Sequence, residues 1–175
     1  MGVRKSSTLT LVIAAAISAL GVITLMLGSV VQMLDLSVAV IASLFVVFAV
    51  IELRGPYPYL VYAVTAVLSM LLLPVKTAAL SYFCFTGYYP ILKSRLEKSR
   101  LPDVLCWVIK ILFFNAVLAV AVLVTVFVLH LPMSRIAYLM LALLTPVFVL
   151  YDVALTRLIT FYMIRLRDRL TFLKK

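Results

Sequence analysis

Residues 9–31, LTLVIAAAISALGVITLMLGSVV, decide the fold class, because 23 consecutive positions carry no charged side chain. A helix that spans a bilayer needs about 20 such residues. The same character extends over the chain of 175 residues, of which 66% are hydrophobic and 13% are charged, with a mean hydropathy of +1.25. This composition excludes a soluble globule and a disordered chain as the main interpretation. We therefore expect lipid to surround most of the protein.

Further apolar segments follow the first at short intervals. Together they predict membrane-spanning helices over six ranges, which are residues 9–31, 36–53, 57–73, 77–92, 102–131 and 134–164. The third and fourth ranges are short, so re-entrant or nearly untilted helices are alternatives there. The connections leave no room for a soluble domain. We expect an all-α integral membrane protein with one transmembrane domain over residues 1–175, a compact bundle of six helices.

The basic residues indicate the orientation of these helices. With six spans, both termini lie on one side of the membrane, and that side holds twelve Lys and Arg residues against two, Lys76 and Arg135, on the other. Lys and Arg collect in cytoplasmic loops, so we predict that both termini are cytoplasmic. Topology and contact with anionic lipid head groups then explain most of the formal net charge of +10, and we expect no nucleic-acid partner.

The residue patterns of enzymes are missing from the chain. It has no paired His and Cys set, no glycine-rich phosphate loop and no nucleophile elbow. Cys84 and Cys106 lie in apolar runs and are most simply buried small side chains, while His130 is the only histidine. We predict no enzymatic activity, no metal site and no cofactor.

Two ionisable residues of opposite charge fall inside predicted helices. Lys110 lies about eight residues, or roughly 12 Å, into the fifth helix from its cytoplasmic start. Asp152 lies somewhat deeper in the sixth helix, within reach of a long lysine side chain. We predict an ion pair between Lys110 and Asp152, either as a structural contact or as part of a proton or substrate path.

The first helix carries small residues at helical spacing. Ala14 and Ser18 form one small-xxx-small pair, and Ala15 and Ala19 form another. Such pairs give a helix a flat strip that another backbone can approach closely. The strip fits either packing inside the bundle or docking against a second membrane subunit through Ala15, Ser18 and Ala19.

Polar residues on the outer side could line a solute cavity. Lys76 and Arg135 suit an anionic substrate group, and Asn115 lies near mid-membrane. The alternative is that such residues are solvated loop groups. The predicted substrate-binding residues are Lys76, Tyr82, Asn115, Arg135 and Tyr138, with Phe85 as an apolar wall. Such a mixture of apolar walls and few polar groups is typical of ligand sites.

The run from Phe85 to Lys93, FTGYYPILK, stands at the cytoplasmic end of the fourth helix. Aromatic side chains favour the membrane interface, so the run fits an aromatic belt with a proline kink. The alternative is a cytoplasmic coupling surface.

Six short helices, cytoplasmic termini and the strip Ala15-Ala16-Ile17-Ser18-Ala19 resemble the substrate-binding S components of energy-coupling-factor transporters. The resemblance implies a subunit of the bacterial plasma membrane that captures a vitamin-like nutrient in its outer half. It also implies that the strip contacts a transmembrane coupling subunit, which works with ATPases. The layout is similar to the shape-determining protein MreD as well, which implies the alternative of a scaffold in cell-envelope assembly that binds no ligand.

Overall fold

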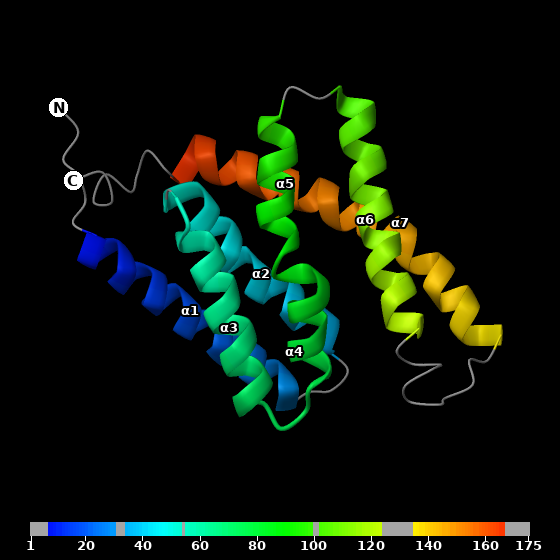
Figure 1. The fold of residues 1–175 in the computed structure, drawn as a ribbon, viewed down its shortest axis with the longest axis horizontal. Helices are drawn as coiled ribbons and strands as arrows, with labels where there is room; N and C mark the ends of the chain where they lie inside the picture. Colours follow the sequence, from blue (N-terminus) through cyan, green and yellow to red (C-terminus); the bar gives the residue numbers. More distant parts are fainter. Residues whose placement is uncertain (1–6, 31–33, 54, 100–101, 124–134, 167–175) are drawn as a thin grey trace. The chain divides into compact units, whose positions relative to one another are not determined.

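The computed structural model describes residues 7–30, 34–53, 55–99, 102–123 and 135–166, without the side chains of residues 7, 30, 103, 135–142 and 166. Every regular element in these ranges is helical (Figure 1), which confirms the all-α class. Within the described ranges, four helices are long and apolar enough to cross a membrane, over Thr8–Ser29, Asp35–Glu52, Val104–Leu123 and Leu143–Arg165. The chain divides into two compact units, Met1–Leu101 and Pro102–Lys175. The six-span topology, the orientation and the single domain stay predictions.

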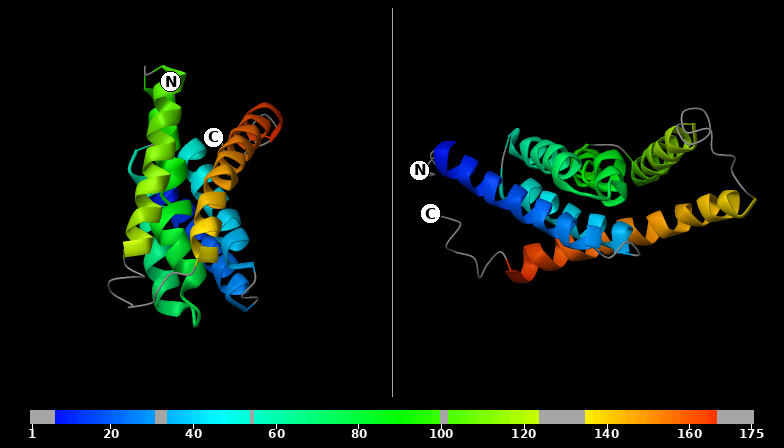
Figure 2. Two further views of the ribbon diagram at one scale, coloured as in Figure 1. Left: turned by 90° about the vertical axis from the view of Figure 1, so that its right-hand side faces the viewer. Right: turned by 90° about the horizontal axis from the view of Figure 1, so that it is seen from below.

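The first unit is built on α1 (Ser7–Val30), which packs along both α2 (Asp35–Glu52) and α3 (Tyr57–Leu72), as Figures 1 and 2 show. Small residues let the three backbones approach one another, because they present little side chain at the contact. The fully buried positions of α2 and α3 include Ala39, Ala42, Ala49 and Ala66. The core of this unit is therefore rich in alanine, beside larger apolar side chains such as Leu25 and Tyr82.

Two glycines of α1 lie at close approaches to the neighbouring helices. A Cβ built on Gly28 would lie 2.5 Å from Cγ1 of Val38 on α2, and one built on Gly21 would lie 3.0 Å from Cγ2 of Thr65 on α3. Val and Thr have few χ1 rotamers, so neither side chain can move aside easily. The absence of a side chain at Gly21 and Gly28 thus sets the spacing of α1 from its neighbours.

The predicted fourth helix forms a longer and interrupted path. It starts as α4 (Thr77–Ser81), continues as a π-helical segment, η2 (Tyr82–Thr86), and resumes as α5 (Tyr89–Lys98), six residues beyond the predicted end. Pro90 explains the interruption, since it has no N–H to donate to Thr86 and its ring crowds that carbonyl. The N–H of Gly87 instead donates to the carbonyl of Tyr82, five residues back, at 2.9 Å.

The second unit contains α6 (Asp103–Leu123), α7 (Arg135–Phe161) and a terminal π-helical turn, η4 (Tyr162–Leu166). Figure 1 shows α6 and α7 crossing at a wide angle. The rings of Phe114 on α6 and Phe148 on α7 stack at 4.6 Å between centroids, with planes 6° apart. This aromatic contact fixes one point of the crossing.

Candidate functional site

The small-residue strip of α1 divides into a buried and an exposed row. Ala14 and Ser18 are buried, and the Ser18 carbonyl accepts a hydrogen bond from Oγ1 of Thr65 on α3 at 3.4 Å. Ala15 and Ala19, one position further along, are exposed. Of the predicted docking residues, Ser18 therefore takes part in internal packing, whereas Ala15 and Ala19 form a flat surface that the described residues leave uncovered.

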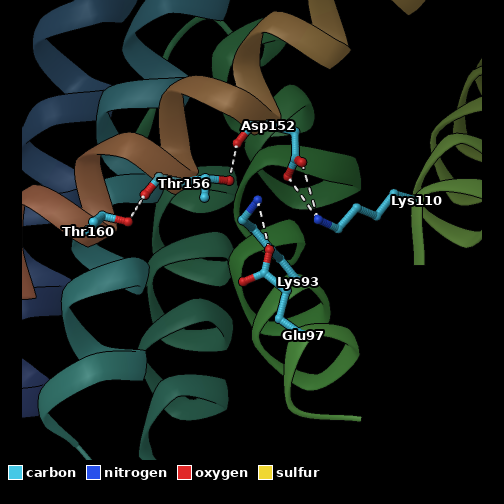
Figure 3. A network of polar contacts seen from close by, with 6 residues as sticks. All are labelled: Lys93, Glu97, Lys110, Asp152, Thr156 and Thr160. Atoms are coloured by element: carbon cyan, nitrogen blue, oxygen red, sulfur yellow. Dashed lines mark hydrogen bonds and ion pairs between the residues drawn. The ribbon is translucent and has the colours of Figure 1, made fainter. Parts of the chain in front are cut away.

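The predicted ion pair between Lys110 and Asp152 is present in the second unit (Figure 3). The Nζ atom of Lys110 lies 3.2 Å from Oδ2 and 3.5 Å from Oδ1 of Asp152. The exposed fractions of the two side chains are 5% and 2%. Lys110 also stands 5.3 Å from the ring centroid of Trp107 on its own helix. The ammonium thus has a carboxylate and a π face as neighbours, which together offset the cost of burying its charge.

Two threonines continue this polar line along α7. The hydroxyl of Thr156 donates to the carbonyl of Asp152 at 2.9 Å, and that of Thr160 donates to the carbonyl of Thr156 at 2.9 Å (Figure 3). Hydroxyls that donate to the carbonyl four residues back satisfy their own proton inside the helix. The oxygens of both hydroxyls can still accept a hydrogen bond, but neither hydroxyl has a second proton to donate.

Lys76 makes hydrogen bonds to the backbone at the end of α3. Its Nζ donates to the carbonyls of Met70 at 2.6 Å and Leu73 at 2.5 Å. Met70 lies in the last turn of α3 and Leu73 directly follows the helix, so the ammonium caps the end of α3. Nearby in the chain, the Thr77 hydroxyl donates to Oδ2 of Asp35, which ties the start of α4 to the start of α2.

Tyr82, the other predicted substrate residue of the first unit, is fully buried in the core. Its ring lies 6.1 Å from that of Tyr62, and both rings crowd Gly87, where an added Cβ would come within 2.7 Å of Tyr82 and 2.9 Å of Tyr62. Phe85, the predicted apolar wall, stacks on Tyr89 at 5.3 Å. These rings pack around the π-helical segment.

Tyr62 has a second role at this segment. Its hydroxyl donates to the carbonyl of Phe83 at 2.7 Å. In an uninterrupted α-helix the Phe83 carbonyl would accept a hydrogen bond from the N–H of Gly87. Here that N–H donates to the carbonyl of Tyr82 instead. A tyrosine of α3 therefore satisfies a backbone group that the π-helical segment leaves open. Such segments recur at functional sites in proteins.

The remaining predicted substrate residues belong to the second unit. Asn115 is exposed on α6 and donates from Nδ2 to the Ile111 carbonyl at 2.9 Å. Arg135 and Tyr138 lie in the first turns of α7, and their side chains are outside the described part, as is His130. The predicted solute site thus draws residues from both units, and its assembly stays a prediction.

Lys93 lies one residue beyond the predicted end of the fourth helix at residue 92. It lies within α5, is 1% exposed, and its Nζ is 3.2 Å from Oε1 of Glu97, which is 43% exposed (Figure 3). Two residues further, the guanidinium of Arg95 stands 5.0 Å above the ring of Tyr59. The i,i+4 spacing of Lys93 and Glu97 is the signal that could have extended the helix.

Among the described residues, none of the His, Cys, Asp and Glu side chains group in sets of three that could hold a metal ion. Comparison of the chain with known protein families, curated proteins and solved structures finds no significant match.

Proposed function

We propose that the chain is the solute-binding subunit of an uptake system, which captures a vitamin-like nutrient at the outer face of a bacterial plasma membrane. It would pass the solute to a coupling transmembrane subunit driven by partner ATPases. The apolar helices support a place in the membrane. The partner is part of the proposal because the sequence lacks a phosphate-binding loop that could use ATP.

The observation that carries the proposal is the exposed row of Ala15 and Ala19. The other row of the same strip is already used against α3, where Ser18 meets Thr65. Large apolar residues surround the two alanines on the exposed side of α1, among them Val12 and Ile23. A flat patch between larger side chains lets a second helix approach closely, which is the geometry of helix docking in a membrane.

A scaffold of MreD type is the second candidate, and the contacts of Lys76 and Tyr82 favour it. Lys76 caps α3, and Tyr82 is buried among core rings, so both have structural roles that need no ligand. In that case the same alanine row would dock a cell-envelope protein. The two candidates share the docking surface and differ in whether a solute binds.

The docking role is tested by Ala15→Leu/Ala19→Leu in the full chain. The added side chains should abolish co-purification with a transmembrane subunit and its ATPases from membranes of the native host. Ala63→Leu is the matched control, because Ala63 is also an exposed alanine but lies on α3, beside the large exposed residues Leu60 and Val67. If the complex survives the double change, docking through this row is wrong. Co-purification with envelope proteins instead would favour the scaffold.

A further inference from the structure

The end of α7 carries a groove with two guanidinium groups. It is lined by Thr156, Arg157, Thr160, Phe161, Ile164 and Arg165, all from α7 and η4. Arg157 and Arg165 are eight residues apart, or about 12 Å along a helix, and long side chains at that spacing can converge on one anion. The guanidinium of Arg165 stands 5.9 Å from the ring centroid of Phe161, which lies between them.

A shallow apolar surface adjoins the basic groove on the same helix. It shares Arg157 and Phe161 and extends toward the helix start along Leu150, Val153, Ala154 and Leu158. All four of these residues are exposed. The helix face therefore changes from apolar to basic along its axis. An amphiphile with a long apolar part and a negatively charged head has the complementary arrangement.

Arg157 itself requires a counter-charge. It is exposed within the apolar helix Leu143–Arg165, which is long enough to cross a membrane. Among the residues that the structure describes, no acidic side chain forms an ion pair with it. The nearest carboxylate in sequence, Asp152, is taken by Lys110. A guanidinium near the hydrocarbon region is costly unless it reaches an anion, and phosphate is the partner that its planar donors match best.

We propose that this groove is a binding site for an anionic phospholipid. The head-group phosphate lies between Arg157 and Arg165, and an acyl chain follows Leu158, Val153 and Leu150. The apolar part of the groove favours a lipid over free phosphate. A net negative head group is favoured over a zwitterionic one, because the choline cation of phosphatidylcholine competes with arginine for the same phosphate. This site is independent of the proposed uptake function.

The test is native mass spectrometry of the full chain in detergent with equal amounts of phosphatidylglycerol and phosphatidylcholine of identical acyl chains. The protein should retain phosphatidylglycerol over phosphatidylcholine on the order of tenfold, as expected for charge-assisted contacts. Arg157→Gln/Arg165→Gln should remove this preference. Arg157→Lys/Arg165→Lys, which keeps both charges, should preserve most of it.

The control is Arg95→Gln/Lys98→Gln, which removes two charges from exposed positions on α5 and should leave the preference intact. Ala154→Phe, which fills the apolar part, should weaken retention without changing the charge. Equal retention of both lipids by the unaltered protein would overturn the proposal, as would equal loss in the control. Glycerol 3-phosphate, which has a phosphate but no acyl chain, should not displace the lipid, and displacement would contradict a lipid site. The lipid preference and the glycerol 3-phosphate competition are measured on the unaltered protein, so they test the proposal even if the double Gln variant fails to fold.

Discussion

The ammonium of Lys110 and the carboxylate of Asp152 lie 3.2 Å apart between α6 and α7, with both side chains almost completely buried. Replacing only Lys110 by Met leaves a buried carboxylate without its cation, which costs about 3–5 kcal/mol in comparable buried pairs. We expect Lys110→Met to lower the unfolding free energy in detergent by that amount. Lys110→Met/Asp152→Leu should recover most of the loss.

The double variant also separates the two interpretations of the pair. A structural ion pair predicts that the stable double variant keeps full solute binding and uptake. A pair on a proton or substrate path predicts a stable protein with impaired uptake. Failure of the double change to restore stability would mean that other contacts of these residues dominate.

Gly28 sets the distance between α1 and α2. A Cβ at this position would lie 2.5 Å from Cγ1 of Val38, a branched side chain with little freedom to move. We expect Gly28→Ala to destabilise the protein by about 1–3 kcal/mol, the range for overpacked cores. Val38→Ala should relieve the clash, so Gly28→Ala/Val38→Ala should be more stable than Gly28→Ala alone in thermal unfolding. Unchanged stability of Gly28→Ala would contradict the close approach.

The hydroxyl of Tyr62 supports the π-helical segment through the Phe83 carbonyl. Tyr62→Phe removes this bond and should cost about 1 kcal/mol in the free energy of unfolding. Tyr59→Phe is the matched control, because no hydrogen-bond partner of its buried hydroxyl lies among the described residues. That change should be neutral or stabilising. Equal effects of the two substitutions in denaturant titration would argue against the Tyr62 contact.

The ammonium of Lys76 caps α3, so Lys76→Met should cost about 1 kcal/mol of stability by removing hydrogen bonds to the terminal carbonyls. The solute proposal adds a second expectation, which is weaker binding of an anionic solute by the same variant. Lys76→Arg keeps the charge and should preserve binding better than Lys76→Met. A stability loss with unchanged solute affinity would restrict Lys76 to its capping role.

The helical class and the buried pair could be predicted because hydrophobicity and charge report directly on the environment of a side chain. Lys110 and Asp152 interrupt apolar runs, and isolated charges in such runs need a partner. The predicted break between the helices over 36–53 and 57–73 is also present, and Gly55 lies in it with a φ of +85°, a conformation that glycine adopts readily.

The backbone conformation around Pro90 could not be predicted from hydrophobicity and charge. A proline indicates a helix break, but whether the chain stops or passes through a π-helical segment depends on partners such as Tyr62, which lies 21 residues before Phe83. The burial of Lys93 within α5 does not follow from the sequence, because a charged residue after an apolar run usually marks the end of a buried helix. The sequence also does not show which row of the α1 strip faces inward, because that depends on the tertiary contact between Ser18 and Thr65.

The most direct test of the uptake proposal is mass spectrometry of small molecules that remain bound when the full chain is purified in detergent. We expect one metabolite at a stoichiometry near one per chain, which rebinds saturably after removal and binds more weakly to Lys76→Met. A protein that carries no metabolite and shows no saturable binding to a panel of vitamins would contradict solute capture and favour the scaffold.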